Sequence, residues 1–235
     1  MSETSDLSSA QSRRFGSCWV WSAASLPAAD ALVILRLGDG DPGLVRIGGA
    51  GRGSAWTLKV DGESAVLRHY QRGGVMARFN RDLYFWAGAN RTRSAREFAL
   101  MSQLADAGLP VPRPIAALAC RTGGIFYRAA ILTRYVENRG CLCDVPTEGA
   151  WRGAGQAIAR MHRLGVWHAD LNVHNILIDA AERAWLIDFD RALAGQTSLA
   201  RLQENLSRLL RSVRKVCPEL ERDLWPVLLE GYANP

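Results

Sequence analysis

Two clusters of polar residues stand beside short apolar runs in the second half of the chain. The first contains His168, Asp170 and Asn175, and the second begins at Asp188 in the sequence Asp-Phe-Asp. A carboxylate, an amide and a second carboxylate, each at the end or start of a predicted strand, form a set that can hold a metal-bound nucleotide and orient a hydroxyl group. This spacing therefore favours phosphoryl transfer.

Each of these residues has a place in that chemistry. Asp170, in a loop before a predicted strand at 175–178, would accept the proton of an attacking hydroxyl or orient that hydroxyl. Asn175 and Asp188 supply oxygen atoms of the kind that Mg²⁺ binds together with nucleotide phosphates. His168 belongs to the same catalytic loop, where we expect it to brace the loop by hydrogen bonds more than to react. The alternative interpretation is a turn with ordinary polar caps.

A glycine-rich segment lies between two predicted strands, 44–47 and 55–60. Because no helix follows it, the segment does not match a dinucleotide fingerprint or a P-loop, both of which need one. A glycine-rich hairpin can instead fold over nucleotide phosphates, since backbone N–H groups approach closely where no Cβ intrudes. Gly49, Gly51 and Gly53 are the candidates for this contact. The alternative is a flexible hairpin loop without a ligand.

Arg68 lies on a third predicted strand, 65–70, where alternation places it on one face with its apolar neighbours two residues away. An arginine in such surroundings needs a partner, because an unpaired buried charge is unfavourable. Glu97, on a predicted helix at 94–105, is the candidate. An Arg–Glu pair could hold a cation against the α- and β-phosphates of a nucleotide. The alternatives are a surface ion pair or no pair.

Composition places the chain among ordinary globular proteins. Its 235 residues suit one large domain or two small lobes, and 48% of them are hydrophobic and 22% charged. The five cysteines are odd in number and irregularly spaced, which favours reduced thiols in a cytosolic compartment. No Cys/His pattern matches structural zinc.

The net charge is +6, from 27 arginines, two lysines and 23 acidic residues. Such a balance favours anionic partners. Seven arginines and one acidic residue lie in 68–96, a segment that could contact an anionic acceptor or lipid headgroups, although a solvated face is the simpler interpretation. No apolar run approaches the ~20 residues that span a bilayer, and the polar N-terminus is no signal peptide. We therefore expect a soluble or peripheral protein.

The chain order predicts two lobes after a short tail. Residues 1–14 are expected to be disordered, 15–137 to form an N-terminal lobe of strands and one helix, and 138–235 to form a C-terminal lobe. A predicted helix at 198–216 carries a long apolar stripe opposite basic residues, and we expect it to pack on its lobe or to lie on an anionic membrane. His162 is interpreted as a packing histidine.

At these residues the chain resembles the protein-kinase-like superfamily over about 44–191. The resemblance implies an α+β, two-lobed fold with an antiparallel sheet in the N-terminal lobe and a mainly helical C-terminal lobe. It also implies dependence on ATP and Mg²⁺. Three features depart from the usual pattern: Arg68 replaces the strand lysine, Asp190 replaces the glycine of Asp-Phe-Gly, and only 45 residues follow Asp190. Lys59 is the other lysine that could grip the phosphates.

Several longer motifs are similar to the 3-deoxy-D-manno-octulosonic acid (Kdo) kinase family of lipopolysaccharide synthesis, over most of 44–215. They are LRHYQRGG, RTRSAREF, GLPVPRP, HADLNVHNILID and LIDFDR. This resemblance implies transfer of the ATP γ-phosphate to the O-4 hydroxyl of the inner-core Kdo sugar on a lipid A precursor. It also implies a peripheral enzyme at the cytoplasmic side of a bacterial inner membrane, in contact with an anionic membrane surface. A nucleic-acid binder is a weaker alternative: the basic segment allows it, but the sequence contains no nucleic-acid recognition module, so no nucleic-acid partner is expected.

Two other functions stay open at this point. One is a different small-molecule phosphotransferase, of the lipopolysaccharide heptose kinase or aminoglycoside type. The other is a nucleotide-binding pseudokinase scaffold, which the missing strand lysine favours. The presence of Asp170, Asn175 and Asp188 together argues against a scaffold, because a scaffold needs no complete catalytic set.

Overall fold

The computed structural model describes residues 12–47, 54–70, 83–195 and 198–235. The chain forms two compact units, one of Met1–Ala99 with Arg113–Tyr135 and the other of Leu100–Pro112 with Val136–Pro235. Residues 100–112 thus belong to the second unit, although they precede the lobe boundary after 137 that the sequence analysis expects. The reason is visible in the backbone, where the Leu186 N–H donates to the Pro110 carbonyl at 2.9 Å.

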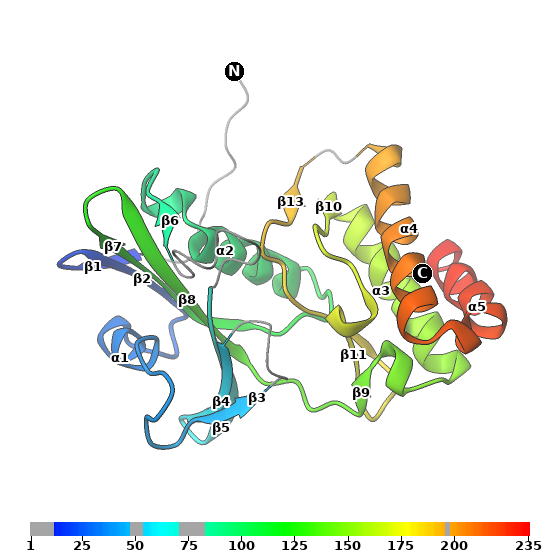
Figure 1. Ribbon diagram of the computed structural model, residues 1–235, viewed down its shortest axis with the longest axis horizontal. Coiled ribbons are helices and arrows are strands. Elements are labelled where there is room, and N and C mark those ends of the chain that lie inside the picture. The colour runs from blue at the N-terminus through cyan, green and yellow to red at the C-terminus, as the bar shows by residue number, and fades with distance from the viewer. Residues whose placement is uncertain (1–11, 48–53, 71–82, 196–197) are drawn as a thin grey trace. The chain divides into compact units, whose positions relative to one another are not determined.

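An antiparallel sheet forms the first unit, and its described strands run in the order β1-β2-β7-β8-β5-β4-β3, with β6 paired to β8 (Figure 1). The strands are β1 (Ser12–Phe15), β2 (Cys18–Ser22), β3 (Val45–Ile47), β4 (Ser54–Val60), β5 (Glu63–His69), β6 (Tyr84–Phe85), β7 (Pro114–Thr122) and β8 (Phe126–Arg134). Asp61 and Gly62 join β4 to β5 with φ of 50° and 82°. These positive values belong to the tight hairpin turn that an Asp-Gly pair predicts.

The two faces of this sheet differ. One face packs against α1 (Ala28–Ile34), in a core that includes Trp56, Leu67 and Leu132. Because side chains alternate along β5, Arg68 points to the opposite face. There α2 (Arg93–Asp106) begins, held by the hydroxyl of Ser94, which donates to the Leu118 carbonyl at 2.9 Å.

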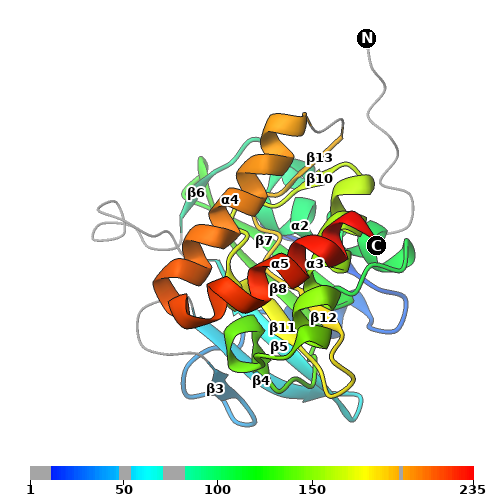
Figure 2. The same ribbon diagram turned by 90° about the vertical axis from the view of Figure 1, so that its right-hand side faces the viewer.

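Helices dominate the second unit (Figure 2). They are α3 (Glu148–Arg163), α4 (Leu199–Val216) and α5 (Glu221–Ala233), with short 3₁₀ turns η3 (Leu142–Asp144), η4 (Val173–Asn175) and η5 (Pro218–Leu220). Small sheets join β9 (Gly140–Cys141), β11 (Ile176–Ile178) and β12 (Ala184–Leu186), and β10 (Val166–Trp167) with β13 (Leu193–Ala194). This combination of an antiparallel sheet and a helical unit is the α+β class that the sequence predicts.

Two glycines of the second unit lie where the helices α3 and α5 are in close contact. A Cβ on Gly155 of α3 would collide with the Leu228 carbonyl of α5, and a Cβ on Gly231 of α5 would collide with the Arg152 carbonyl of α3. The helices therefore touch backbone to backbone. The apolar side chains of α3 face the interior of the unit, since Trp151 and Ile158 are fully buried.

Two expectations about the chain's ends and its last long helix are wrong. Residues 12–14, expected to be disordered, form β1, which pairs with β2. The apolar stripe of α4 is shorter than predicted, because Leu199 and Val216 are 77% and 42% exposed. Leu209 and Val213 of the predicted stripe are buried, together with the polar Asn205.

The expectation of reduced thiols also differs from the structure, which contains two disulfides. Cys18 and Cys120 stand directly opposite each other on β2 and β7, with Cα atoms 4.0 Å apart. Cys143 of η3 is linked to Cys217 at the end of α4. Partners 102 and 74 residues apart leave no local spacing pattern in a sequence, so only the fold shows the pairing. Cys141 is a free thiol.

No helix in the described part of the chain combines the length and the hydrophobicity that a membrane crossing requires.

Candidate active site

A buried carboxylate in the first unit binds two partners from β5 and its end. The Arg68 guanidinium donates from Nη2 to Oε1 of Glu97 at 2.5 Å, and the Tyr70 hydroxyl donates to Oε2 of the same residue. The Arg68 guanidinium also lies over the Tyr70 ring, 5.2 Å from its centroid. The Glu97 side chain is 2% exposed and that of Arg68 is 26% exposed. The predicted Arg68–Glu97 pair is therefore present, and its action on phosphates stays a prediction.

Lys59 occupies a different end of the same hairpin. It lies opposite Ser64 near the β4–β5 turn, and its ammonium group donates to the Ser64 hydroxyl at 2.9 Å. Arg68 lies opposite Ala55, at the other end of the ladder. Among the described residues of the first unit, Arg68 is thus the basic side chain that binds Glu97.

In the second unit, His168 joins the two predicted polar clusters. Its Nδ1 accepts the backbone N–H of Asp170 at 3.2 Å, so its Nε2 carries the proton and donates to the Ile187 carbonyl at 3.0 Å. The ring is fully buried and meets Phe189 edge-on, with centroids 4.9 Å apart. Burial lowers the pKa of His168, and the Ile187 carbonyl and the charge of Asp188 oppose this in part. His168 therefore holds the loop by hydrogen bonds, and any catalytic part of its role stays a prediction.

Two amide side chains bind the backbone of the catalytic loop. The Nδ2 groups of Asn175 and Asn172 both donate to the Asp170 carbonyl, at 2.8 and 2.9 Å. The Asp170 side chain is 65% exposed, so its carboxylate can meet a substrate. Since Asn175 uses its amide nitrogen to hold the loop, its amide oxygen is the atom that can bind a cation.

Asp188 is the residue after Ile187, whose carbonyl binds the His168 ring. The backbone on its N-terminal side is fixed because the Ile187 N–H donates to the Asn175 carbonyl at 3.1 Å. Asp188 itself has a φ of 63°, in the left-handed region that few residues other than glycine adopt. Asn175 and Asp188 thus belong to one hydrogen-bonded framework. Non-glycine residues in this conformation cluster at functional sites.

Sequence reasoning missed the support that α4 gives to the catalytic loop. Asn205 is fully buried; its Nδ2 donates to the His168 carbonyl at 2.6 Å, and its Oδ1 accepts the His168 N–H at 3.1 Å. The Ser212 hydroxyl accepts the N–H of Val173 at 3.2 Å. Arg208 lies between these two on the same helical face, with Nη1 3.8 Å from Oδ1 of Asp170. The sequence feature that could have indicated this support is the polar residue Asn205 beside the apolar stripe of α4.

His162 is a packing residue, as predicted. Its Nε2 lies 3.1 Å from Oδ1 of Asn205 and its Nδ1 2.8 Å from the Tyr232 hydroxyl. Burial lowers the pKa of His162, and the hydrogen bond to Asn205 opposes this in part. The two buried histidines and Asn205 form one continuous network that reaches from α5 to the catalytic loop.

The predicted glycine contacts cannot be placed in this site. Gly49, Gly51 and Gly53 lie in 48–53, outside the described residues. Of the other predicted residues, Arg68 and Glu97 meet in the first unit, whereas His168, Asp170, Asn175 and Asp188 are brought together in the second. The second set offers an exposed carboxylate beside an amide and a further carboxylate, which suits transfer of a phosphoryl group to a hydroxyl.

Comparison with known proteins agrees with this chemistry. A 3-deoxy-D-manno-octulosonic acid kinase of Xylella fastidiosa is 48% identical over 177 residues, which are 74% of this chain and 71% of the relative. The enzyme of the same name from Stenotrophomonas maltophilia is 49% identical over 174 residues, 72% of this chain and 70% of the relative. That from Xanthomonas euvesicatoria is 50% identical over 170 residues, with 71% and 68% covered.

A solved structure shares the fold. It is described as WaaP in complex with acyl carrier protein, has a TM-score of 0.50 and 17% identity, and is matched over 87% of this chain and 90% of the other. The model of the lipopolysaccharide kinase (Kdo/WaaP) family matches residues 45–232, which include both candidate residue sets. The chain therefore belongs to the lipopolysaccharide kinase (Kdo/WaaP) family.

Proposed function

We propose that the chain is a 3-deoxy-D-manno-octulosonic acid kinase that transfers the γ-phosphate of ATP to the O-4 hydroxyl of the Kdo sugar on a lipid A precursor. The observation that carries the proposal is the brace through His168, which fixes the Asp170 loop against the segment that leads into Asp188. Identity of 48–50% to three relatives that bear this enzyme name supports the choice of acceptor.

The proposed reaction uses the exposed carboxylate of Asp170. The acceptor hydroxyl oxygen attacks the γ-phosphorus, the bond from that phosphorus to the bridging oxygen of ADP breaks, and the hydroxyl proton passes to the Asp170 carboxylate. Asn175 and His168 keep this carboxylate in place through the Asp170 carbonyl and N–H. Because both backbone groups are held, the loop does not have to reorganise when the acceptor binds.

Asn175 and Asp188 fit a magnesium ion by their chemistry. Mg²⁺ in nucleotide sites binds to one or two protein oxygens and to the phosphates, and it needs no cage of three or more acidic or histidine side chains. No such cage is found among the described residues. We assign the amide oxygen of Asn175 and the carboxylate of Asp188 to the ion. When bound, the ion supplies positive charge beside the phosphate oxygens.

The first unit contributes the nucleotide contacts in this proposal. Glu97 holds the Arg68 guanidinium, and a planar guanidinium fixed in this way suits phosphate oxygens. The glycines Gly49, Gly51 and Gly53 are assigned to the phosphates on the sequence pattern alone. An arginine in place of lysine keeps the positive charge, so the substitution does not by itself exclude catalysis.

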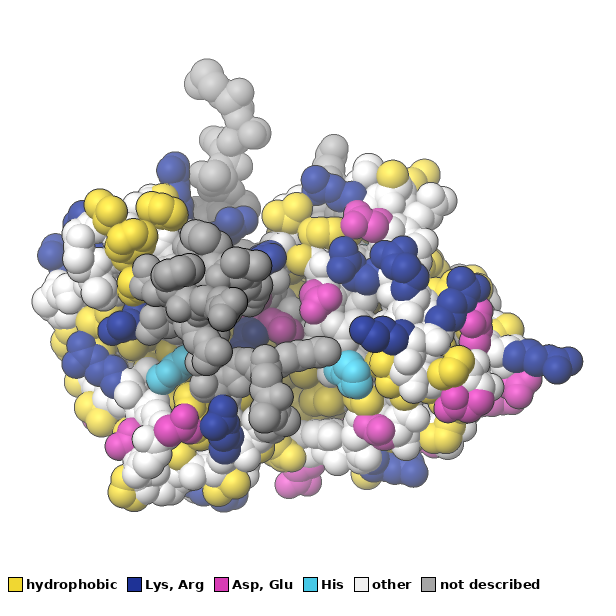
Figure 3. All heavy atoms as spheres, viewed as in Figure 1, with side chains coloured by type: hydrophobic (Ala, Val, Ile, Leu, Met, Phe, Trp, Pro, Cys, Tyr) yellow, Lys and Arg dark blue, Asp and Glu magenta, His cyan; other side chains and the backbone are white. Residues whose placement is uncertain are grey.

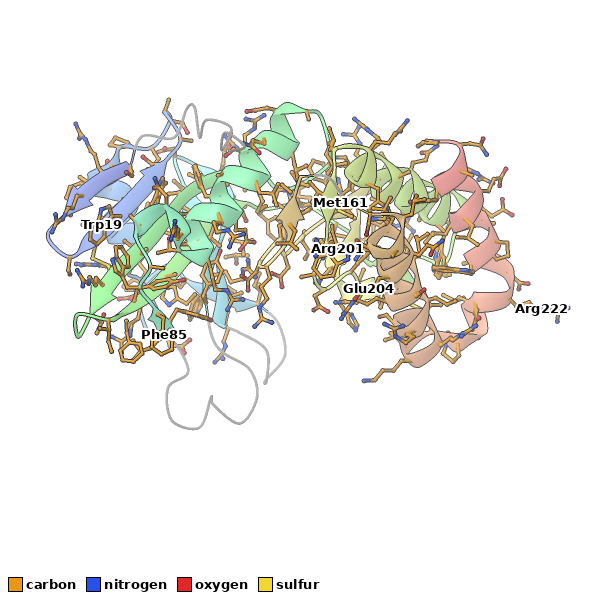
Figure 4. All side chains as sticks on the ribbon, turned by 90° about the horizontal axis from the view of Figure 1, so that it is seen from above. Trp19, Phe85, Met161, Arg201, Glu204 and Arg222 are labelled. Carbon is orange, nitrogen blue, oxygen red and sulfur yellow. A yellow bond between two sulfur atoms is a disulfide. The ribbon has the colours of Figure 1, made fainter. Side chains whose placement is uncertain are left out.

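A lipid-linked acceptor requires access to a membrane, and one corner of the first unit suits that task. Phe85 of β6 and Ile125 of the β7–β8 turn are 68% and 59% exposed. Phe85 projects from the unit in Figure 4, and hydrophobic side chains gather beside basic ones at this corner in Figure 3. Arg121 and Arg128 flank Ile125 along the chain and are exposed. Exposed aromatic residues beside arginines favour the interface of an anionic bilayer, so we propose peripheral attachment here, at the cytoplasmic side of the inner membrane.

The proposal is tested by transfer from labelled ATP to a Kdo-bearing lipid A precursor, with Mg²⁺ present. The expected product gains one phosphate, and fragmentation in mass spectrometry places it on O-4 of the Kdo. The Asp170→Asn variant keeps the fold and should lose about 10²–10⁴-fold in rate. If the wild-type chain binds ATP but phosphorylates no Kdo acceptor, the proposed function is wrong.

A further inference from the structure

Arg208 of α4 lies at the edge of the candidate active site. Its Nη1 is 3.8 Å from Oδ1 of Asp170, and its Nη2 is 3.7 Å from Oε1 of Glu204, one turn earlier on α4. The Arg208 side chain is 36% exposed, so part of it faces the solvent beside the catalytic carboxylate. Basic side chains gather over α4 with acidic ones between them (Figure 3), and Figure 4 labels Glu204 on this helix.

The donors of Arg208 are not saturated by these contacts. Both ion-pair distances exceed the 2.7–2.9 Å of a strong charge-assisted hydrogen bond. The Nε–H is buried and has no hydrogen-bond partner within the described part of the chain. A guanidinium has five N–H groups in a planar fork. Arg208 therefore presents donors beside Asp170 that a further anionic group can use.

The geometry points to the carboxylate of the acceptor sugar as that group, and we propose that Arg208 binds it. This inference rests on the proposed function. The acceptor named in the relatives is an acid, and its carboxylate is separated from the O-4 carbon by a short stretch of the same sugar ring. One sugar can thus present its hydroxyl to Asp170 and its carboxylate to Arg208. A planar guanidinium binds a carboxylate through two parallel hydrogen bonds, which adds orientation to charge.

A binding role and a purely structural role of Arg208 predict different preferences between acidic and neutral acceptors. If Arg208 binds the acceptor carboxylate, the enzyme favours acidic sugars over neutral ones because the neutral sugar leaves the guanidinium unpaired. If Arg208 only holds Asp170, its loss lowers the rate equally for both kinds of acceptor. The two roles are therefore separable by changing the acceptor and the enzyme together.

The experiment measures kcat/KM for four combinations of wild-type or Arg208→Gln enzyme with a Kdo acceptor or its carboxamide. We expect the wild-type enzyme to prefer the acid by about 10- to 100-fold. The Arg208→Gln variant should lose most of this preference while its KM for ATP stays unchanged. Arg211→Gln, an exposed position three residues further along α4, removes the same charge and should keep the wild-type preference.

Two results would overturn the inference. One is an Arg208→Gln enzyme that still prefers the acid as strongly as the wild type does. The other is an equal loss on both acceptors. If Arg208→Gln does not fold, Arg208→Lys keeps the charge and should retain part of the preference, and full retention would also contradict a bidentate contact. A wild-type enzyme that phosphorylates neither acceptor speaks against the proposed function and not against Arg208 alone.

Discussion

Replacement of Asn205 by alanine should destabilise the chain more than any exposed substitution on α4. The side chain is fully buried and binds three groups: the N–H and the carbonyl of His168, and Nε2 of His162. Its removal leaves these groups without that partner in a place that water does not reach. A buried polar group left unsatisfied is unfavourable by about 1–3 kcal/mol. Relaxation of the helix offsets part of the sum, so we expect a loss of about 3–6 kcal/mol.

This loss is a large part of the free energy of unfolding, which is about 5–15 kcal/mol for a typical domain. The measurement is urea-induced unfolding followed by tryptophan fluorescence and by circular dichroism, without reductant. Gln203→Ala, at an exposed position of the same helix, should change the free energy of unfolding by less than about 0.5 kcal/mol. Asn205→Leu fills the volume without hydrogen bonds and should be as unstable as Asn205→Ala. A loss below about 1 kcal/mol for Asn205→Ala, or full rescue by leucine, would refute the reasoning.

Three further predictions concern other parts of the chain. Arg68→Ala should weaken ATP binding about tenfold or more in calorimetry, whereas Lys59→Ala should leave it unchanged; the reverse outcome would assign the phosphates to Lys59. Burial lowers the pKa of His162 and His168 below the ordinary 6.5, so the unfolded chain binds more protons than the folded one once the pH falls below that value. Stability should therefore decrease on acidification below pH 6.5, by at most about 1.4 kcal/mol per pH unit for each histidine, and urea midpoints that stay constant between pH 7.5 and 5.5 would contradict this. Gly155→Ala should lower the free energy of unfolding by about 1–3 kcal/mol in a thermal melt, because its Cβ meets the backbone of α5, and an unchanged Tm would show that the helices separate easily.

Local patterns in the sequence predict most of the elements near the site. Period-two alternation along β5 places Arg68 opposite the core face, and the helical period of α2 brings Glu97 to that side, so their pairing follows from two local rules. The role of His168 as a brace follows from its place in the loop. These predictions succeed because each one depends on neighbours within a few residues or on one strand next to one helix.

The rest depends on contacts between distant parts of the chain. Asn205 is 37 residues from the His168 backbone that it binds, and nothing in the spacing of either residue indicates the other. The same holds for Arg208 beside Asp170. Periodicity overestimates the length of the apolar stripe on α4. It shows which face of the helix is apolar, but not how far the neighbouring elements extend along that face. Leu199 is therefore apolar by pattern and exposed in the fold.

The two disulfides make the covalent state of the protein depend on its surroundings. They close segments of 102 and 74 residues, and in the chain-entropy model each such link disfavours the unfolded chain by roughly 4–5 kcal/mol. A reducing buffer removes this contribution, so reduced and oxidised preparations are chemically distinct samples with different resistance to heat and proteolysis. Assays of the enzyme should accordingly state the thiol reagent used, and a thiol count before and after unfolding tells which sample was measured.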